Sequence, residues 1–275
     1  MHARADGSGA ATPGAGSPTV AAVARRPFRP WSGLAGAITF LTVVPMPSAA
    51  VGDAGLGSAA VWFPVVGAAV GALVGGVRVL GGHVLGAGVS SALALTVLVA
   101  VTGALHQDGL ADTADGIGAR GGGRARRLAA MRDSSTGVFG VLALIAWALL
   151  LFTTVSALDG DRALRALVVA CALGRWAALV HAATTSPARA DGLGASLHMG
   201  RVALGVATGV ALIVALAVGG LVAGAAAVAA GIVVAALSAG FARNTLGGRT
   251  GDTLGATVAV VEVAVCVVLL GVWQG

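Results

Sequence analysis

Long apolar stretches alternate with short polar segments along almost the whole chain. A helix that crosses a bilayer needs about 20 consecutive, mainly apolar residues. The stretches that meet this requirement are residues 57–80, 84–105, 138–157, 163–184, 202–221, 223–242 and 254–273. The pattern therefore predicts an all-α fold, a polytopic membrane helix bundle with about seven transmembrane helices.

The N-terminal part of the chain departs from this pattern. Residues 1–30 are rich in Ala, Gly, Ser, Pro and Arg without periodicity, which predicts a disordered tail. Residues 34–44 form a shorter apolar run that ends at Pro45. Arginines before this run imitate a signal peptide, but further spans follow at once. We therefore expect a short interfacial or re-entrant helix here, followed by spans that make residues 31–275 one integral membrane catalytic domain.

Composition supports a membrane protein and excludes several other classes. The chain is 57% hydrophobic and only 10% charged, where about 25% charge is usual for a soluble domain. Its 44 glycines suit close helix packing in lipid. All 17 basic residues are arginine, and in a membrane protein the net charge of +6 reports loop orientation rather than nucleic-acid binding. Cys171 and Cys266 are far apart in apolar runs, so no disulfide or thiolate metal site is indicated.

The distribution of arginine predicts how the chain is oriented. Residues 106–137 carry five arginines, which places this segment in the cytoplasm. Counting spans onward puts residues 185–201 and 243–253 on the same side. We expect a multi-pass protein of the cytoplasmic membrane, in contact with lipid, whose active-site loops meet on the cytoplasmic side.

An acidic cluster follows the second predicted span. On a helix Asp108, Asp112 and Asp115 lie at positions i, i+4 and i+7, so the three carboxylates share one face. Neighbouring like charges repel unless a cation lies between them, and an all-oxygen set suits Mg²⁺ better than zinc. The alternative is a solvated helix start with acids near the positive end of the dipole. His106 is a candidate general base or an ordinary interfacial residue.

A second polar cluster precedes the third predicted span. Asp133 could complete the carboxylate site, or it could cap the next helix. Arg127 and Arg132 could bind phosphate oxygens, with topology and anionic lipid as the alternative for such arginines. Ser134 is a further candidate in this segment.

The last polar loop, residues 247–255, is a glycine-rich turn that enters the final span. Its backbone N–H groups could hold a phosphate at a helix N-terminus, although it lacks the Lys of a Walker A loop. Gly251 and Asp252 are the candidates in this turn. Glu262, the only Glu of the chain, lies inside the last span and is either functional or the partner of an Arg or hydroxyl. Arg175 in the fourth span, like His181, could line a cavity or lie near the end of its helix.

Three motifs in order resemble one family. Together they look like cobalamin synthase, that is, adenosylcobinamide-GDP ribazoletransferase. The motifs are residues 106–116 (HQDGLADTADG), 131–140 (MRDSSTGVFG) and 247–256 (GGRTGDTLGA). Weaker matches occur at residues 40–47 (FLTVVPMP) and 63–67 (FPVVG), and residues 186–194 are also similar and are interpreted as facing the substrate.

The resemblance implies a multi-pass membrane enzyme that depends on Mg²⁺. The 5′-hydroxyl of α-ribazole, or of its 5′-phosphate, would attack the cobinamide-linked phosphorus of adenosylcobinamide-GDP and release GMP. Metal between carboxylates and phosphates suits that chemistry. The oligomeric state is left open. The implied catalytic residues are His106, Asp108, Asp112, Asp115 and Asp133, of which the four aspartates are the metal ligands. The candidate substrate-binding residues are Arg127, Arg132, Ser134, Gly251, Asp252 and Glu262, and the resemblance implies Asp252 as a further metal ligand or a substrate-positioning group.

Two other classes of membrane protein are alternatives to this family. A CDP-alcohol phosphotransferase also clusters Asp on helices and releases a nucleoside monophosphate, but its signature continues with an Ala-Arg pair. Here Ala111 is followed by Asp112. A transporter would place acids at mid-span and show related halves of the chain. The acids of this chain instead gather at span ends, and no convincing repeat is present.

Overall fold

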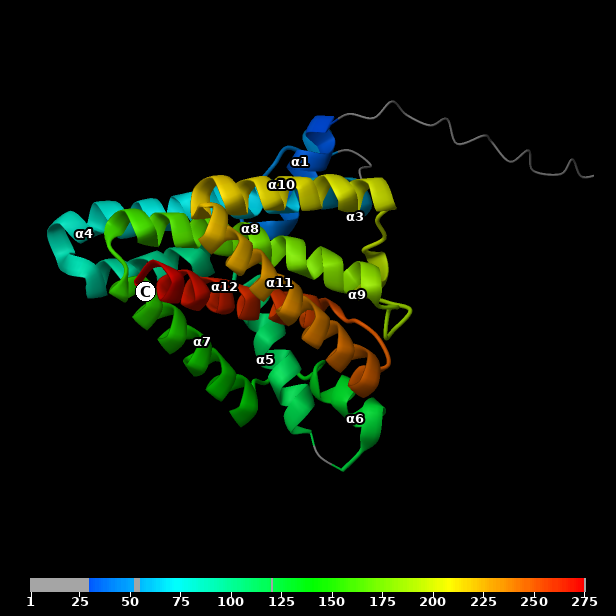
Figure 1. The fold of residues 1–275 in the computed structure, drawn as a ribbon. Helices are drawn as coiled ribbons and strands as arrows, with labels where there is room; N and C mark the ends of the chain where they lie inside the picture. The colour runs from blue at the N-terminus through cyan, green and yellow to red at the C-terminus, as the bar shows by residue number, and fades with distance from the viewer. Residues whose placement is uncertain (1–29, 52–54, 120, 275) are drawn as a thin grey trace, which may run out of the picture.

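The computed structural model describes residues 30–51, 55–119 and 121–274. Within these residues the regular structure is helical, apart from an isolated bridge between Pro187 and Arg249. The helices are α1 Pro30–Leu41, α2 Ser48–Val51, α3 Leu56–Ala59, η1 Ala60–Trp62, α4 Phe63–Thr102, α5 Leu105–Gly118, α6 Gly123–Ala130, α7 Val138–Ala157, α8 Gly160–Thr184, α9 Leu193–Ser196, α10 Arg201–Gly219, α11 Leu221–Phe241, η2 Ala242–Leu246 and α12 Gly251–Gln274 (Figure 1).

The predicted all-α membrane bundle is confirmed. In the described chain, six helices are long and apolar enough to cross a membrane, and the first of them runs from Leu56 to Thr102. This segment contains a break at Gly86, where φ is +73°. The two arms fold back on each other at this break. The close contact shows this: a Cβ added to Gly81 would lie 3.1 Å from Cβ of Ser90. The first two predicted spans are these two arms, and the turn between them comes a few residues later than expected.

The other predicted spans agree closely with the observed helices. The third is α7, and the predicted break between the fifth and sixth falls at Gly220, which separates α10 from α11 at a φ of +88°. The short apolar helix predicted before the first span is α1. The predicted disordered tail, residues 1–30, lies outside the described residues except for Pro30, which begins α1.

Helix α8 forms the centre of the bundle. It is the most buried of the long helices and packs against α4, α10, α11 and α12. Gly71 of α4 presses directly on the α8 backbone at Leu167, as expected for helices held together by small residues in lipid. The outward faces of the surrounding helices are apolar and exposed, for example at Leu142 of α7 and Ile213 of α10. Those faces suit contact with lipid tails.

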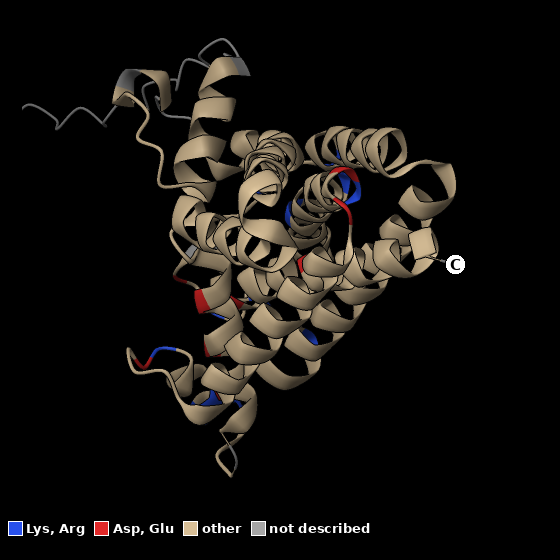
Figure 2. Ribbon diagram, turned by 90° about the vertical axis from the view of Figure 1, so that its left-hand side faces the viewer, with Lys and Arg blue, Asp and Glu red and all other residues tan. Residues whose placement is uncertain are grey.

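The polar loops gather at one end of the bundle, away from the Gly86 turn and the C-terminus (Figure 1). Arg249, after η2, donates to the carbonyls of Thr185, Gly194 and Leu197, which fastens the loop around α9. Arg124 of α6 donates to the Ala188 carbonyl at 2.7 Å. Most of the length of the long helices carries neither basic nor acidic residues (Figure 2). The expected convergence of the three polar loops is therefore present in the fold.

Candidate active site

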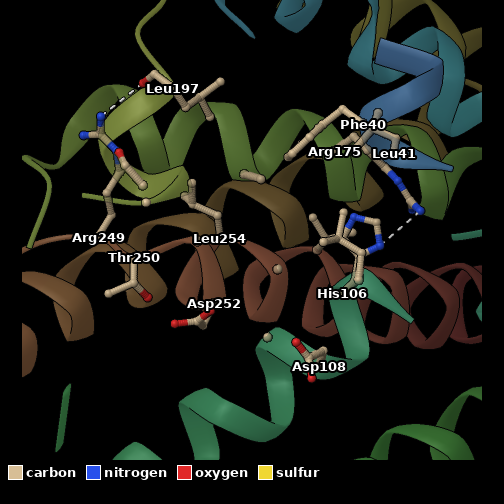
Figure 3. Close-up of a pocket in the computed structure, with 18 of the residues that line it drawn as sticks. Phe40, Leu41, His106, Asp108, Arg175, Leu197, Arg249, Thr250, Asp252 and Leu254 are labelled. Atoms are coloured by element: carbon tan, nitrogen blue, oxygen red, sulfur yellow. Dashed lines mark hydrogen bonds between the residues drawn. The ribbon is translucent and has the colours of Figure 1, made fainter. Parts of the chain in front are cut away.

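A cavity of about 290 Å³ lies between α1, α5, α8, the loop around α9 and the start of α12. Figure 3 shows Asp108 and Asp252 on one side of it, with Phe40, His106 and Arg175 at one end. The cavity is lined by Phe40, Leu41, Phe63, Leu105, His106, Asp108, Gly109, Arg175, Ala178, Arg189, Asp191, Gly192, Gly194, Leu197, Arg249, Thr250, Gly251, Asp252, Leu254, Gly255 and Val258. An apolar interior with a few convergent polar groups is typical of a small-molecule site.

The crossing of α5 over α12 brings the first and third motifs together. A Cβ added to Gly109 would lie 2.6 Å from the Asp252 carbonyl oxygen, and one added to Gly255 would lie 3.5 Å from Cα of Gly109. At Gly109 only glycine permits this approach, because a Cβ there would overlap the α12 backbone. Asp108 is the neighbour of Gly109, so the crossing places its carboxylate and that of Asp252 on the same cavity.

Asp112 lies one helical turn beyond Asp108 and carries a perturbed pKa. Partial burial, followed by repulsion from Asp108, Asp252 and Asp115 in that order, raises the pKa of its carboxyl to about 6. The structure thus gathers negative charge at this face of α5. Among the described residues, no three Asp, Glu, His or Cys side chains converge closely enough to hold a metal ion by themselves.

Asp115 accepts hydrogen bonds from the start of a neighbouring helix, α7. Its Oδ2 accepts from the backbone N–H of Gly137 at 2.7 Å, and its Oδ1 accepts from that of Gly140 at 2.9 Å. Asp115 therefore caps the first turn of α7 from outside, where unpaired N–H groups need acceptors. The carboxylate joins α5 to α7, and it does not line the cavity.

Asp133 and Ser134 lie apart from the cavity. Asp133 accepts from the backbone N–H of Ser135 at 2.9 Å and from its hydroxyl at 2.6 Å, which lowers the pKa of the carboxyl. Its side chain faces a separate open groove beside Arg126 and Phe139. The structure does not bring Asp133 to the acidic face of α5, because a local turn through Ser135 holds its carboxylate.

The predicted phosphate-binding arginines make protein contacts. Arg127 donates to the Ile117 carbonyl at 3.4 Å. Arg132 forms an exposed ion pair with Asp191 at 2.9 Å, and Asp191 lines the cavity. Arg132 is therefore placed at the rim, whereas Arg127 supports the end of α5.

The glycine-rich turn forms one polar wall of the cavity. Thr250 and Thr253 cap the start of α12 reciprocally: the backbone N–H of each donates to the hydroxyl of the other, at 2.9 and 3.1 Å. Gly251 and Asp252 are then the first two residues of α12, where N–H groups have no partner inside the helix. A helix start of this kind favours an anionic ligand.

A buried polar cluster lies at the other end of the cavity. Arg175 of α8, 1% exposed, forms an ion pair with Glu262 of α12, 2% exposed. Arg175 also approaches Nδ1 of His106 through Nη2 at 3.5 Å. Burial, and then the neighbouring guanidinium, hold the pKa of His106 well below its usual range. Glu262 does not line the cavity. It is the ion-pair partner of Arg175, which is the alternative role that the sequence analysis gave it.

Sequence reasoning singled out Arg175 and residues 186–194 only as weaker candidates, yet both contribute to the cavity. Arg189 lines it and donates through Nη2 to the Leu128 carbonyl at 3.1 Å, while its Nε is buried without a partner in the described chain. Phe40 and Phe63 also line it. Their signal was their position in the two weaker motifs. His181 is buried against Thr257 and lies outside the lining.

Comparison with known proteins agrees with this arrangement of motifs. Three relatives named adenosylcobinamide-GDP ribazoletransferase are similar to this chain. The protein from Xanthobacter autotrophicus is 42% identical over 264 residues, covering 87% of this chain and 94% of the relative. The protein from Mesorhizobium japonicum is 40% identical over 235 residues, which cover 84% of this chain and 90% of the relative. The protein from Azorhizobium caulinodans is 43% identical over 169 residues, which cover 58% of this chain and 63% of the relative.

No solved structure matches this chain. The family model that matches it describes cobalamin-5-phosphate synthase and covers residues 33–270, which includes most of α1 and α12, the long helices between them and all of the motifs around the cavity. The match to the model and the two nearly full-length relatives lead to one assignment. This multi-pass membrane protein belongs to the cobalamin-5-phosphate synthase family.

Proposed function

We propose that this chain is an adenosylcobinamide-GDP ribazoletransferase and that the cavity between α5 and α12 is its active site. The observation that carries this proposal is the Gly109–Gly255 crossing, which sets Asp108 beside Asp252 and the open start of α12. Carboxylates and a helix N-terminus on one cavity suit a substrate that contains a pyrophosphate. Residues 31–275 then act as one catalytic domain.

The reaction forms one P–O bond and breaks another. The 5′-oxygen of α-ribazole attacks the cobinamide-linked phosphorus, the bond from that phosphorus to the bridging oxygen breaks, and GMP leaves. The hydroxyl proton passes to a carboxylate or to solvent. In this scheme the N–H groups of Gly251 and Asp252 hold phosphate oxygens, and Arg189 neutralises charge at the rim.

The acidic residues fit a bound Mg²⁺. Repulsion among Asp108, Asp112 and Asp252 raises the pKa of Asp112, and a cation between these carboxylates would relieve that repulsion. Mg²⁺ usually takes one or two carboxylates together with substrate phosphates, so a complete protein cage is not required. When bound, the ion would neutralise charge that develops on the phosphoryl oxygens. We propose that one or two of Asp108, Asp112 and Asp252 hold the ion together with substrate phosphates, and that Asp115 positions α5 against α7.

The direct test supplies adenosylcobinamide-GDP and α-ribazole to the purified protein in lipid nanodiscs with Mg²⁺. We expect GMP and adenosylcobalamin in equal amounts. Release of GMP without α-ribazole would instead indicate a hydrolase. Release of CMP from a CDP-alcohol would indicate the phosphotransferase alternative.

The apparent affinity for Mg²⁺ is expected to fall as the pH is lowered. A proton on Asp112, with a pKa of about 6, competes with the ion, so the Mg²⁺ concentration for half-maximal rate should rise about fourfold from pH 7.0 to 5.5. Both phosphates of adenosylcobinamide-GDP are diesters and do not titrate in this range. Initial rates at several Mg²⁺ concentrations measure the effect. A pH-independent value for the wild type would contradict the assignment.

We further propose that the polar end of the bundle faces the cytoplasm, since α6 and its flanks carry the densest arginines. Cys171 and Cys266 are buried, so a cysteine introduced at an exposed position can be labelled selectively. An Ala125→Cys variant should react with an impermeant maleimide only in inside-out vesicles. The matched Asp161→Cys variant, at the opposite end, should react only in right-side-out vesicles. The reverse result would invert the proposed orientation.

A further inference from the structure

The apolar end of the cavity is built from aromatic side chains of two separate segments. Phe40, at the end of α1, stacks on Phe63, at the start of α4, with ring centroids 5.6 Å apart and an interplanar angle of 15°. Leu41, Leu105 and Val258 continue the same lining. Figure 3 shows Phe40 and Leu41 beside His106 and Arg175, whereas Thr250 and Arg249 lie at the opposite end. A flat apolar ring is the ligand group that this end accommodates best.

Polar groups are few at this end, and most are already paired. The terminal nitrogens of Arg175 face Glu262, the Cys171 carbonyl and Nδ1 of His106. A guanidinium can only donate, so Nδ1 of His106 is the acceptor and the ring proton lies on Nε2. The His106 ring lines the cavity, and no described residue accepts from Nε2. The apolar end thus offers a ligand one directed donor.

We propose that this end of the cavity binds the base of the nucleoside substrate, stacked on Phe40 and Phe63, with its unsubstituted ring nitrogen accepting from Nε2 of His106. This inference rests on the proposed function, which supplies α-ribazole as the substrate. Its base is a dimethylbenzimidazole, a flat and largely apolar bicycle with one free acceptor nitrogen. The aromatic wall suits the flat apolar rings of that base, and the one donor suits its one acceptor nitrogen.

The guanine of the other substrate fits this end less well. Guanine carries several N–H donors, and the Phe40, Phe63 and Leu41 side chains leave those donors without acceptors, which is costly in a buried site. Arg175 has no pair of free terminal nitrogens to read the guanine edge. The chemistry at this end therefore favours the benzimidazole over the guanine.

Size and position place the two substrates relative to each other. The cavity of about 290 Å³ is at the lower end of the range for small-molecule pockets, about 300–1,000 Å³, so it holds one nucleoside and leaves the corrin ring outside. His106 and Asp108 are two residues apart on α5 and both line the cavity. A base held at His106 directs the ribose, and with it the 5′-hydroxyl, towards the carboxylates of Asp108 and Asp252.

The first test measures KM for each substrate in Phe→Leu variants, which keep an apolar side chain and remove the ring. Phe40→Leu and Phe63→Leu should raise KM for α-ribazole about five- to tenfold and leave KM for adenosylcobinamide-GDP unchanged. Phe152→Leu is the matched control, because Phe152 packs on the core from α7 without lining the cavity. It should change neither KM.

A rise in KM for adenosylcobinamide-GDP instead would place the guanine at this end and overturn the proposal, as would no change in either KM.

The second test uses an α-riboside of dimethylindole, in which a C–H replaces the free nitrogen. The wild type should prefer α-ribazole about tenfold in kcat/KM, and His106→Leu should lose that preference. A preference that persists in His106→Leu would exclude His106 as the donor.

Calorimetric binding of α-ribazole alone separates the two proposals. The wild type should bind it, and Phe40→Leu should bind it about five- to tenfold more weakly, whether or not GMP is released on adding the second substrate. Absence of GMP release with normal α-ribazole binding would refute only the transferase mechanism. Equal binding by the wild type and Phe40→Leu would refute the base site.

Discussion

Asp108→Asn is expected to reduce GMP release about a thousandfold while the protein still inserts into the membrane at its normal level. Asn keeps the size of the side chain and removes the charge that faces the cavity beside Asp252. Loss of one group that stabilises a transferring phosphoryl has effects of this size. Asp108 is exposed on α5, so the substitution should cost little stability. Steady-state GMP release, normalised to the inserted protein, measures the effect.

Three further substitutions decide which carboxylates belong to the site. Asp112→Asn should also abolish Mg²⁺-dependent release, since its carboxylate shares the acidic face of α5. Asp161→Asn, in the first turn of α8 at the far end of the bundle, is the control and should be fully active. Asp133→Asn separates two hypotheses. The structure predicts substantial activity, and a loss as large as that of Asp108→Asn would restore the four-aspartate site that the motifs suggested.

Arg175→Met is expected to lower the free energy of unfolding by about 3–5 kcal/mol. The substitution leaves the carboxylate of Glu262 buried in the bundle without its partner, and removal of one member of a buried pair typically costs this much. Thermal unfolding in nanodiscs of fixed composition measures the loss. An unchanged midpoint would show that Glu262 is protonated or that water reaches it.

The double variant Arg175→Met with Glu262→Leu is the matched control. It replaces the ion pair by apolar side chains of similar size, which is often neutral or stabilising, so most of the lost stability should return. Activity should stay low, because the double variant lacks the guanidinium beside Nδ1 of His106. A stable and fully active double variant would show that Glu262 and Arg175 serve only the packing of α8 on α12.

The membrane fold was largely predictable from the chain. Hydrocarbon tails require about 20 apolar residues per helix and satisfied backbone groups, so apolar run length by itself predicts the spans. The predicted third span, residues 138–157, has the bounds of α7. The turn at Gly86 was misplaced by a few residues, because glycines are frequent throughout α4 and only the φ of +73° marks this one as the break.

The candidate site was predictable in part. The spacing of Asp108 and Asp112 placed both on one face of a helix, and the structure agrees. The same reasoning added Asp115 and Asp133, whose oxygens are taken up by the N–H groups of Gly137, Gly140 and Ser135. Residue type and spacing do not distinguish a carboxylate that accepts backbone N–H groups from one that binds a metal ion, because both roles use the same oxygens.

Apolar run length and motif order in the sequence determined the all-α membrane bundle, the acidic helix face and the family. Only the tertiary structure decided which polar groups share a cavity. Asp108 meets Asp252 because Gly109 lets α5 lie directly against the α12 backbone, and Phe40 meets Phe63 because α1 folds over the start of α4. Such meetings depend on how closely the backbones of different helices can approach, which is a property of the packed helices and not of local sequence.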